Sequence, residues 1–198
     1  PAFVVPADGV TVNGGFNYAY RRGGYSLLGR WAYFLRSDWQ PWGNTEEFDP
    51  DTRTYTKYDV GLSKDFHFKL IHTIRLNGNY YGGQRLDRFS MYRFGLFDPA
   101  RMRGIPSAGV RFSEVGMVRA SYSFNLLNRY RLALYADHAW GRTPDERNWM
   151  PTTGIGIEAN FPGPKTTMLK VGAGKGFLPS IYKGSGSFVF EFMLFKPI

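Results

Sequence analysis

The 198-residue sequence contains no cysteine, and this absence removes several kinds of site at once. Disulfide bonds, thiolate metal ligands and cysteine nucleophiles are all excluded. The sequence also has no run that approaches the ~20 apolar residues needed for a membrane-spanning helix, which excludes a helical membrane protein. Mean hydropathy is slightly polar, but a barrel of membrane-spanning strands distributes its apolar residues in alternation, so this value does not indicate a soluble protein.

The sequence also has few acidic residues: it contains 16 Asp and Glu against 25 Lys and Arg, which gives a formal net charge of +9. The basic residues are scattered through every segment and form neither a patch nor a basic helix, so we expect no nucleic-acid partner. A lumen or loop surface that faces anionic lipid headgroups and unfolded polypeptide explains the same charge more simply.

Apolar and polar side chains alternate along one segment after another. In residues 116–127 the even positions are apolar and most odd positions are polar, as Val118, Ala120, Tyr122, Phe124 and Leu126 contrast with Arg119, Ser121, Ser123 and Asn125. Successive side chains of a strand point to opposite faces, so this period of two predicts a strand with one apolar and one polar face. We find nine such segments, roughly 14–22, 25–36, 57–68, 70–82, 116–127, 129–140, 153–161, 167–177 and 186–197.

The connections between these segments alternate between short and long. The short ones are 21–24, 67–69, 127–128 and 162–165, and the long ones are 37–56, 83–115, 141–151 and 178–185. This rhythm is typical of outer-membrane barrels, whose long loops are extracellular. Several aromatic residues lie toward segment ends, as an interfacial girdle requires: Trp31, Tyr33, Tyr58, Trp140, Phe161 and Phe177. We therefore expect an all-β, antiparallel transmembrane β-barrel over residues 1–198, with a soluble sandwich or lipocalin-like barrel as the alternative.

Three side chains interrupt the apolar face: Lys64, His72 and Lys175. A lysine at the middle of the bilayer costs roughly 2 to 4 kcal/mol, and this cost falls toward zero near the interfaces. We expect either that these side chains reach the interface or that the register shifts there by one residue.

The odd number of predicted strands indicates that they do not form a complete barrel by themselves. A complete bacterial barrel normally has an even number of strands and both chain ends in the periplasm. A sheet left open in lipid would also expose two unpaired edges. We therefore expect further strands before Pro1, or a second chain that completes the barrel.

The longest connection contains Met102, Arg103, Gly104 and Ile105, and five predicted strands follow it. Here the sequence resembles the bacterial surface-antigen superfamily, which comprises outer-membrane assembly factors of the BamA type and the transporters of two-partner secretion. In that family a long extracellular loop carries a Val-Arg-Gly-aromatic motif and five strands follow. Residues 135–139, Tyr-Ala-Asp-His-Ala, are similar to the family's aromatic-x-Asp-x-Gly strand motif. Met102, Ile105 and Ala139 depart from these patterns, which suggests a divergent branch.

The resemblance implies a barrel of about sixteen strands in the bacterial outer membrane, of which this chain forms the C-terminal part. It implies that the loop over residues 85–115 folds into the lumen. It also implies a role in inserting or translocating other proteins, with unfolded or secreted client polypeptides, outer-membrane lipid and lipopolysaccharide as partners. The alternative is a passive outer-membrane pore or structural barrel.

A buried arginine requires carboxylates, and the polar faces of two successive predicted strands provide Asp137 and Glu158. We predict that both pair with Arg103, and that Gly104 allows the tight backbone turn beside it. The alternative for Arg103 is a solvated loop residue near lipopolysaccharide, and for Asp137 and Glu158 it is general polarity of the lumen.

The three histidines offer little for catalysis. Asp137 and His138 are adjacent in a strand, so they point to opposite faces, and we expect the pair of Asp65 and His67 to be a polar lumen contact. Ser185 and Ser187 have no histidine within evident reach, and no spacing resembles a zinc or calcium site. The alternating glycines Gly172, Gly174 and Gly176 do not form a phosphate loop. We expect no enzyme, no metal and no cofactor.

Overall fold

The computed structural model describes residues 11–36, 53–69, 71–86, 90–95, 98–105, 111–126, 130–143, 149–162, 167–177 and 188–195. These residues form one antiparallel sheet of nine strands, in which neighbours in sequence are neighbours in space. The strands are β1 (Thr11–Arg22), β2 (Tyr25–Arg36), β3 (Thr54–Phe68), β4 (His72–Gln84), β5 (Glu114–Leu126), β6 (Tyr130–Arg142), β7 (Met150–Pro162), β8 (Met168–Phe177) and β9 (Phe188–Phe195). The predicted all-β antiparallel fold is confirmed.

The strand ends differ from the predicted ones where pairing extends a strand beyond its alternating pattern. The first strand begins at Thr11 rather than at residue 14, because Thr11 pairs with Arg36 at the far end of β2. The tight connection between these strands is a pair of glycines, Gly23 and Gly24, with φ of +57° and +77°. Positive φ at both central residues matches the twist of the two strands that a two-residue turn joins.

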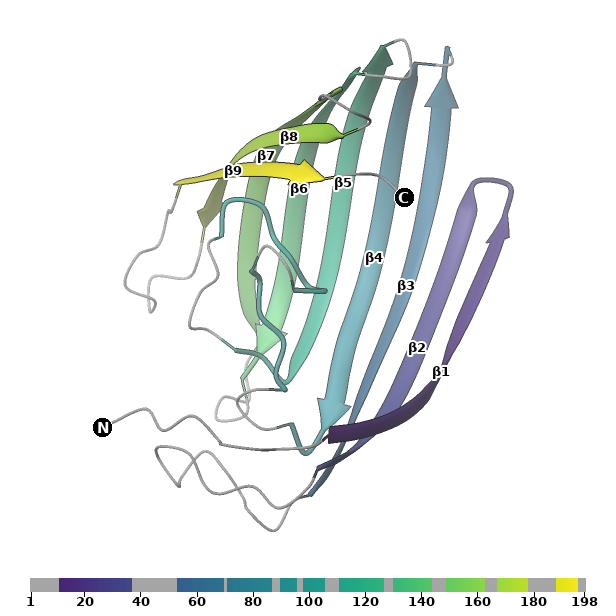
Figure 1. Ribbon diagram of the computed structural model, residues 1–198, viewed down its shortest axis with the longest axis vertical. Coiled ribbons are helices and arrows are strands. Elements are labelled where there is room, and N and C mark those ends of the chain that lie inside the picture. The colour runs from purple at the N-terminus through teal and green to yellow at the C-terminus, as the bar shows by residue number, and fades with distance from the viewer. Residues whose placement is uncertain are drawn as a thin grey trace.

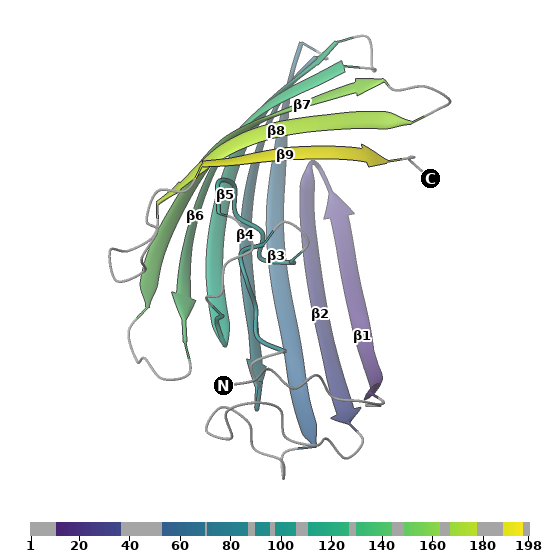
Figure 2. The same cartoon turned by 60° about the vertical axis from the view of Figure 1, so that its left-hand side comes forward.

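The sheet curves strongly, and the connection from β4 to β5 enters its hollow (Figures 1 and 2). We call the face that this connection covers the inner face and the opposite face the outer face. Among the described residues β1 and β9 do not pair with each other, so the sheet is open between them. No helix within the described part of the chain is long and apolar enough to cross a membrane.

The two faces have opposite chemistry, as the alternation predicted. On the outer face large apolar side chains are exposed: Val118 and Leu134 each keep 50% of their surface accessible, and Phe190 keeps 79%. On the inner face of the same strands, polar side chains such as Ser123 and Asp137 are buried. A soluble protein normally has the reverse arrangement, with apolar residues inside and polar residues at the surface.

The buried apolar side chains lie between the inner face and the β4–β5 connection. Phe94 of the connection packs against Phe112 with the two rings tilted and 4.7 Å between their centroids, and Tyr92 donates its hydroxyl hydrogen to the carbonyl of Gly82 at 3.0 Å. The cluster also includes residues of the strands themselves, among them Tyr81, Val115, Met117, Ala139 and Met150. The described residues of the connection are therefore part of the packed core.

The three side chains that interrupt the apolar face do lie on the outer face, in the predicted register. Lys64 lies opposite Tyr25, the first residue of β2, and its ammonium lies 3.6 Å from the centroid of that ring. His72 is the first residue of β4 and contacts the Tyr122 hydroxyl at 2.7 Å. Lys175 lies near the end of β8, and its ammonium lies 5.4 Å from the centroid of the Phe177 ring. Each lies near a hairpin or strand end, so no shift of register is needed.

Candidate functional site

The residues Met102 to Ile105, which we call the loop motif, lie against the inner face of β6, β7 and β8. Met102 and Ile105 are buried at 1% and 3% exposure within the apolar cluster. Their apolar character therefore holds the two ends of the motif against the sheet. The residue between them that carries charge, Arg103, points toward the strands and is 7% exposed.

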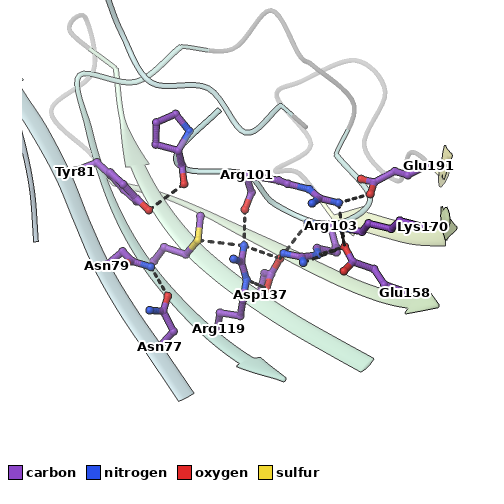
Figure 3. Close-up of polar contacts among 12 residues, drawn as sticks. Asn77, Asn79, Tyr81, Arg101, Arg103, Arg119, Asp137, Glu158, Lys170 and Glu191 are labelled. Carbon is purple, nitrogen blue, oxygen red and sulfur yellow. Dashed lines mark hydrogen bonds and ion pairs between the residues drawn. The ribbon is translucent and has the colours of Figure 1, made fainter. Parts of the chain in front are cut away.

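Arg103 contacts both predicted carboxylates. Its guanidinium donates to Glu158 Oε1 from Nε at 3.2 Å and from Nη2 at 3.0 Å, and its Nη1 lies 3.8 Å from Asp137 Oδ2. Its backbone N–H also donates to Asp137 Oδ2 at 3.0 Å (Figure 3). The Tyr135 ring lies beneath the guanidinium, 3.8 Å from centroid to carbon, which adds a cation–π contact. Asp137 thus fixes the backbone of the motif while Glu158 binds its side chain.

Arg119 of β5 holds Asp137 from the other side. Its Nε donates to Asp137 Oδ1 at 2.6 Å and its Nη2 to Oδ2 at 3.2 Å, in the two-pronged geometry that an arginine fork favours. Arg119 also donates to the carbonyl of Arg101. One strand residue therefore orients the carboxylate and binds the loop backbone directly.

Glu158 accepts three cations at once. Its Oε1 lies 3.0 Å from Arg103 Nη2, 3.0 Å from Arg101 Nη2 and 3.0 Å from Lys170 Nζ of β8. Arg101 continues to Glu191 of β9 through a further ion pair. The charged network therefore extends from β5 to the edge strand β9, with the loop at its centre (Figure 3).

Burial makes these charges depend on one another. Desolvation lowers the pKa of the Arg103 guanidinium from its ordinary value, the neighbouring cation Arg119 lowers it further, and Glu158 opposes both. An arginine remains protonated under these conditions, so its positive charge must be balanced by the carboxylates. The carboxylates of the network are Asp137, Glu158 and Glu191, and its cations are three arginines and Lys170. The cations therefore outnumber the carboxylates.

Glycines of β7 and β8 allow the motif to lie directly on the sheet backbone. A Cβ at Gly154 would come within 2.3 Å of the Arg103 carbonyl oxygen, and one at Gly174 within 2.6 Å of the Gly104 nitrogen. Gly104 itself has φ of +70°, and a Cβ there would meet the backbone of Lys175 at 2.1 Å. Gly104 lies in a tight backbone turn, as predicted. The inward glycines of β7 and β8 have no side chains, so the backbone of Gly104 can lie directly on these strands.

Sequence reasoning identified the central residues and missed the surrounding ones. The structure brings together Arg103, Asp137 and Glu158 as predicted, whereas their functional role stays a prediction. Arg119 could have been found, because the connection from β5 to β6 is short in sequence and restricts the register, which sets Arg119 opposite Asp137. Arg101 and Glu191 had no comparable signal, since their contact joins a loop to a strand about ninety residues away.

Among the residues that the structure describes, no histidine forms a hydrogen bond or an ion pair with a carboxylate. Asp137 is buried on the inner face, whereas His138 contacts Thr153 at 2.8 Å on the outer face, so their predicted separation is confirmed. Asp65 pairs with Arg75 at 2.6 Å, and His67 contacts Thr73 at 3.1 Å. Ser185 and Ser187 lie outside the described residues. Within the ranges that the structure describes, no group of three or more potential ligands could hold a metal ion.

No protein-family model matches the chain, and no curated protein matches its sequence.

Replacing Glu158 by alanine should destabilise the protein more than replacing Arg103. Glu158→Ala leaves the buried Arg103 and the partly buried Arg101 and Lys170 with one fewer carboxylate, and it should cost about 3 to 5 kcal/mol of unfolding free energy. In Arg103→Ala, Asp137 keeps its partner Arg119, and Glu158 keeps Arg101 and Lys170. We therefore expect a loss of about 1 to 3 kcal/mol of unfolding free energy. Urea unfolding measures both values. Arg30→Ala is the control, because its exposed pair with Asp59 should contribute no more than about 1 kcal/mol. Equal losses for the two site variants would contradict the central position of Glu158.

Gly154→Ala should release the loop motif while leaving the strands paired. The added methyl group meets the Arg103 carbonyl, a backbone atom that can move only with the loop. Limited trypsin digestion should then cut at residues 101 to 103 at least tenfold faster than in the parent protein. Gly116→Ala on the outer face of β5 is the matched control, since nothing lies within 4 Å of its Cβ. A Gly154→Ala protein as resistant as the control would show that the close approach is not needed for docking.

Proposed function

We propose that this chain forms part of a transmembrane β-barrel in the bacterial outer membrane and acts there in the insertion or translocation of other proteins. The observation that carries the membrane part is the inverted chemistry of the sheet. Its outer face exposes rows of Leu, Val, Ile and Phe, and its charged residues gather on the inner face. A hydrocarbon solvent outside and a polar interior would stabilise this arrangement, which is the pattern of outer-membrane barrels.

Closure of the barrel requires more than the nine described strands. Within the described part of the chain, no strand pairs with the outer edges of β1 and β9, and unpaired backbone groups there would cost several kcal/mol each in lipid. We propose that further strands, from this polypeptide or from a second chain, pair with these edges. Outer-membrane lipid and lipopolysaccharide would then surround the outer face.

The docked loop supports the translocation role. A long connection that folds into the hollow of the sheet and is held there by Arg103, Asp137 and Glu158 is what the surface-antigen resemblance implies. The described residues of the loop occupy part of the hollow of the sheet, and its ion pairs hold it there. We propose that it acts as a plug or gate for unfolded or secreted client polypeptides, with no enzymatic step and no cofactor.

One observation favours the alternative of a passive pore. Away from the loop, the inner face carries exposed ion pairs, Arg30 with Asp59 at 2.9 Å and Arg75 with Asp65 at 2.6 Å. Such pairs would suit a water-filled path for small solutes along β1 to β4. The loop would then only narrow this path.

Membrane insertion is tested by placing a charge on each face. Leu134→Arg, on the outer face of β6, should cost about 2 to 4 kcal/mol in lipid bilayers, because arginine near the midplane is poorly solvated. Asn17→Arg, at an exposed inner-face position of β1, should change stability by less than about 0.5 kcal/mol. Unfolding of both variants from phosphatidylcholine vesicles measures the difference. An outer face that lies in water would tolerate arginine equally well at both positions.

The role of the loop is tested by Arg103→Ala in two assays of the same proteoliposomes. As a translocation device, the variant should insert an added unfolded outer-membrane barrel at least tenfold more slowly, and the parent should show little steady conductance. As a passive pore, the parent should conduct steadily, and the variant should conduct more because the loop no longer narrows the lumen. In the insertion assay, Arg30→Ala serves as the control for loss of an inner-face cation away from the loop. Steady conductance together with unchanged client insertion would contradict the translocation role.

A further inference from the structure

The charged residues of the outer face are confined to strand ends. At outward positions of the nine strands they are Arg22 and Lys64 beside the β1–β2 turn, and Glu114, Arg142 and Lys175 near the opposite ends. The only carboxylate of this set, Glu114, pairs with Arg142 and accepts a hydrogen bond from Tyr80 at 3.0 Å. The β1–β2 end therefore carries two cations on the outer face and no compensating acid.

Arg22, Tyr25 and Lys64 form one row across three strands. Arg22 lies opposite Tyr25, and Tyr25 lies opposite Lys64. Two strand spacings, roughly 10 Å, separate the two cations, which is within reach of one anion for side chains of this length. The Lys64 ammonium is held over the Tyr25 ring and donates to the Gly23 carbonyl at 2.7 Å, which leaves two of its hydrogens for another acceptor. Arg22 has no hydrogen-bond or ion-pair partner among the described residues.

The next row of the same face is apolar. Leu27 lies opposite Leu62, and both are two residues from the row of cations on their own strands. Asp65, the nearest acid in sequence, points to the inner face, where Arg75 binds it through both carboxylate oxygens. The surface thus combines two cations, an aromatic ring and an adjoining apolar row.

We propose that Arg22, Tyr25 and Lys64 bind the phosphate of an anionic phospholipid whose acyl chains lie along Leu27 and Leu62. The guanidinium and ammonium groups supply charge-assisted hydrogen bonds to the phosphate, and the ring holds Lys64 at the polar–apolar boundary. The proposal rests on membrane insertion of the barrel. It also explains why a lysine occurs on the apolar face beside this turn: there it meets headgroups and not hydrocarbon.

The site is tested with the double variant Arg22→Gln, Lys64→Gln and a matched control, Arg21→Gln, Lys175→Gln. The control removes the same charge, from the neighbouring inward position and from the opposite end of the outer face. Native mass spectrometry of detergent-solubilised protein measures retention of added phosphatidylglycerol. We expect each cation of the site to contribute about fivefold to this affinity, so the double variant should bind about 25-fold more weakly and the control within twofold of the parent.

Two further measurements, competition by inorganic phosphate and flotation with vesicles, distinguish the ways in which the proposal can be wrong. Inorganic phosphate at millimolar concentration should not displace the lipid, because it lacks acyl chains; full displacement would identify a free-anion site and overturn the lipid proposal. Equal lipid loss in the double variant and the control would overturn it as well. Flotation of the parent protein with vesicles is measured in parallel. A parent that fails to float would overturn membrane insertion and the lipid site together, whereas a floating parent with unchanged lipid binding in the double variant would overturn the lipid site alone.

Discussion

Successive side chains of a strand point to opposite faces, and in this protein the outer face of the nine strands is mainly apolar. Charged residues then have only the other face and the strand ends. Asp137, Glu158 and Lys170 therefore meet on the inner face although they come from three different strands. Once carboxylates gather in a hollow, cations must follow, and the loop between β4 and β5 brings two of them, Arg101 and Arg103. The docking of the loop is thus a consequence of how the sheet divides its polarity.

The ion pairs and the apolar contacts of the loop have different effects. Met102, Ile105, Phe94 and Phe112 bury apolar surface, which favours a compact loop but does not define one position for it. The hydrogen bonds at Arg103 are directional, and they fix the loop relative to β6 and β7. Because breaking a buried pair leaves an uncompensated charge, the network favours a loop that is either fully docked or fully released. That property suits a gate better than a permanent constriction.

The sequence allows much of this arrangement to be predicted. The period of two gives every strand and the face of almost every side chain, because a strand's geometry leaves no other choice. The opposition of Asp137 and Arg119 follows from a short turn. The contacts of Arg101 with Glu191, and of Gly104 with Lys175 and Gly176, could not be predicted, since they depend on the path of a long loop through space. The alternating glycines of β8 can be seen in the sequence. That they make room for the loop backbone could not be predicted, because the position of the loop was not known.

The glycine surface of β7 and β8 has a consequence for how this protein can change over evolutionary time. Where backbone lies on backbone, no side chain can shrink to make room for a new atom, so a larger residue at Gly154, Gly174 or Gly176 requires a changed path of the loop. Substitutions on the two segments should therefore arise in pairs across divergent descendants. On the outer face the side chains contact one another, as Phe16 contacts Trp31, and no second backbone lies against them, so Leu, Ile, Val and Phe can exchange there with less coupling.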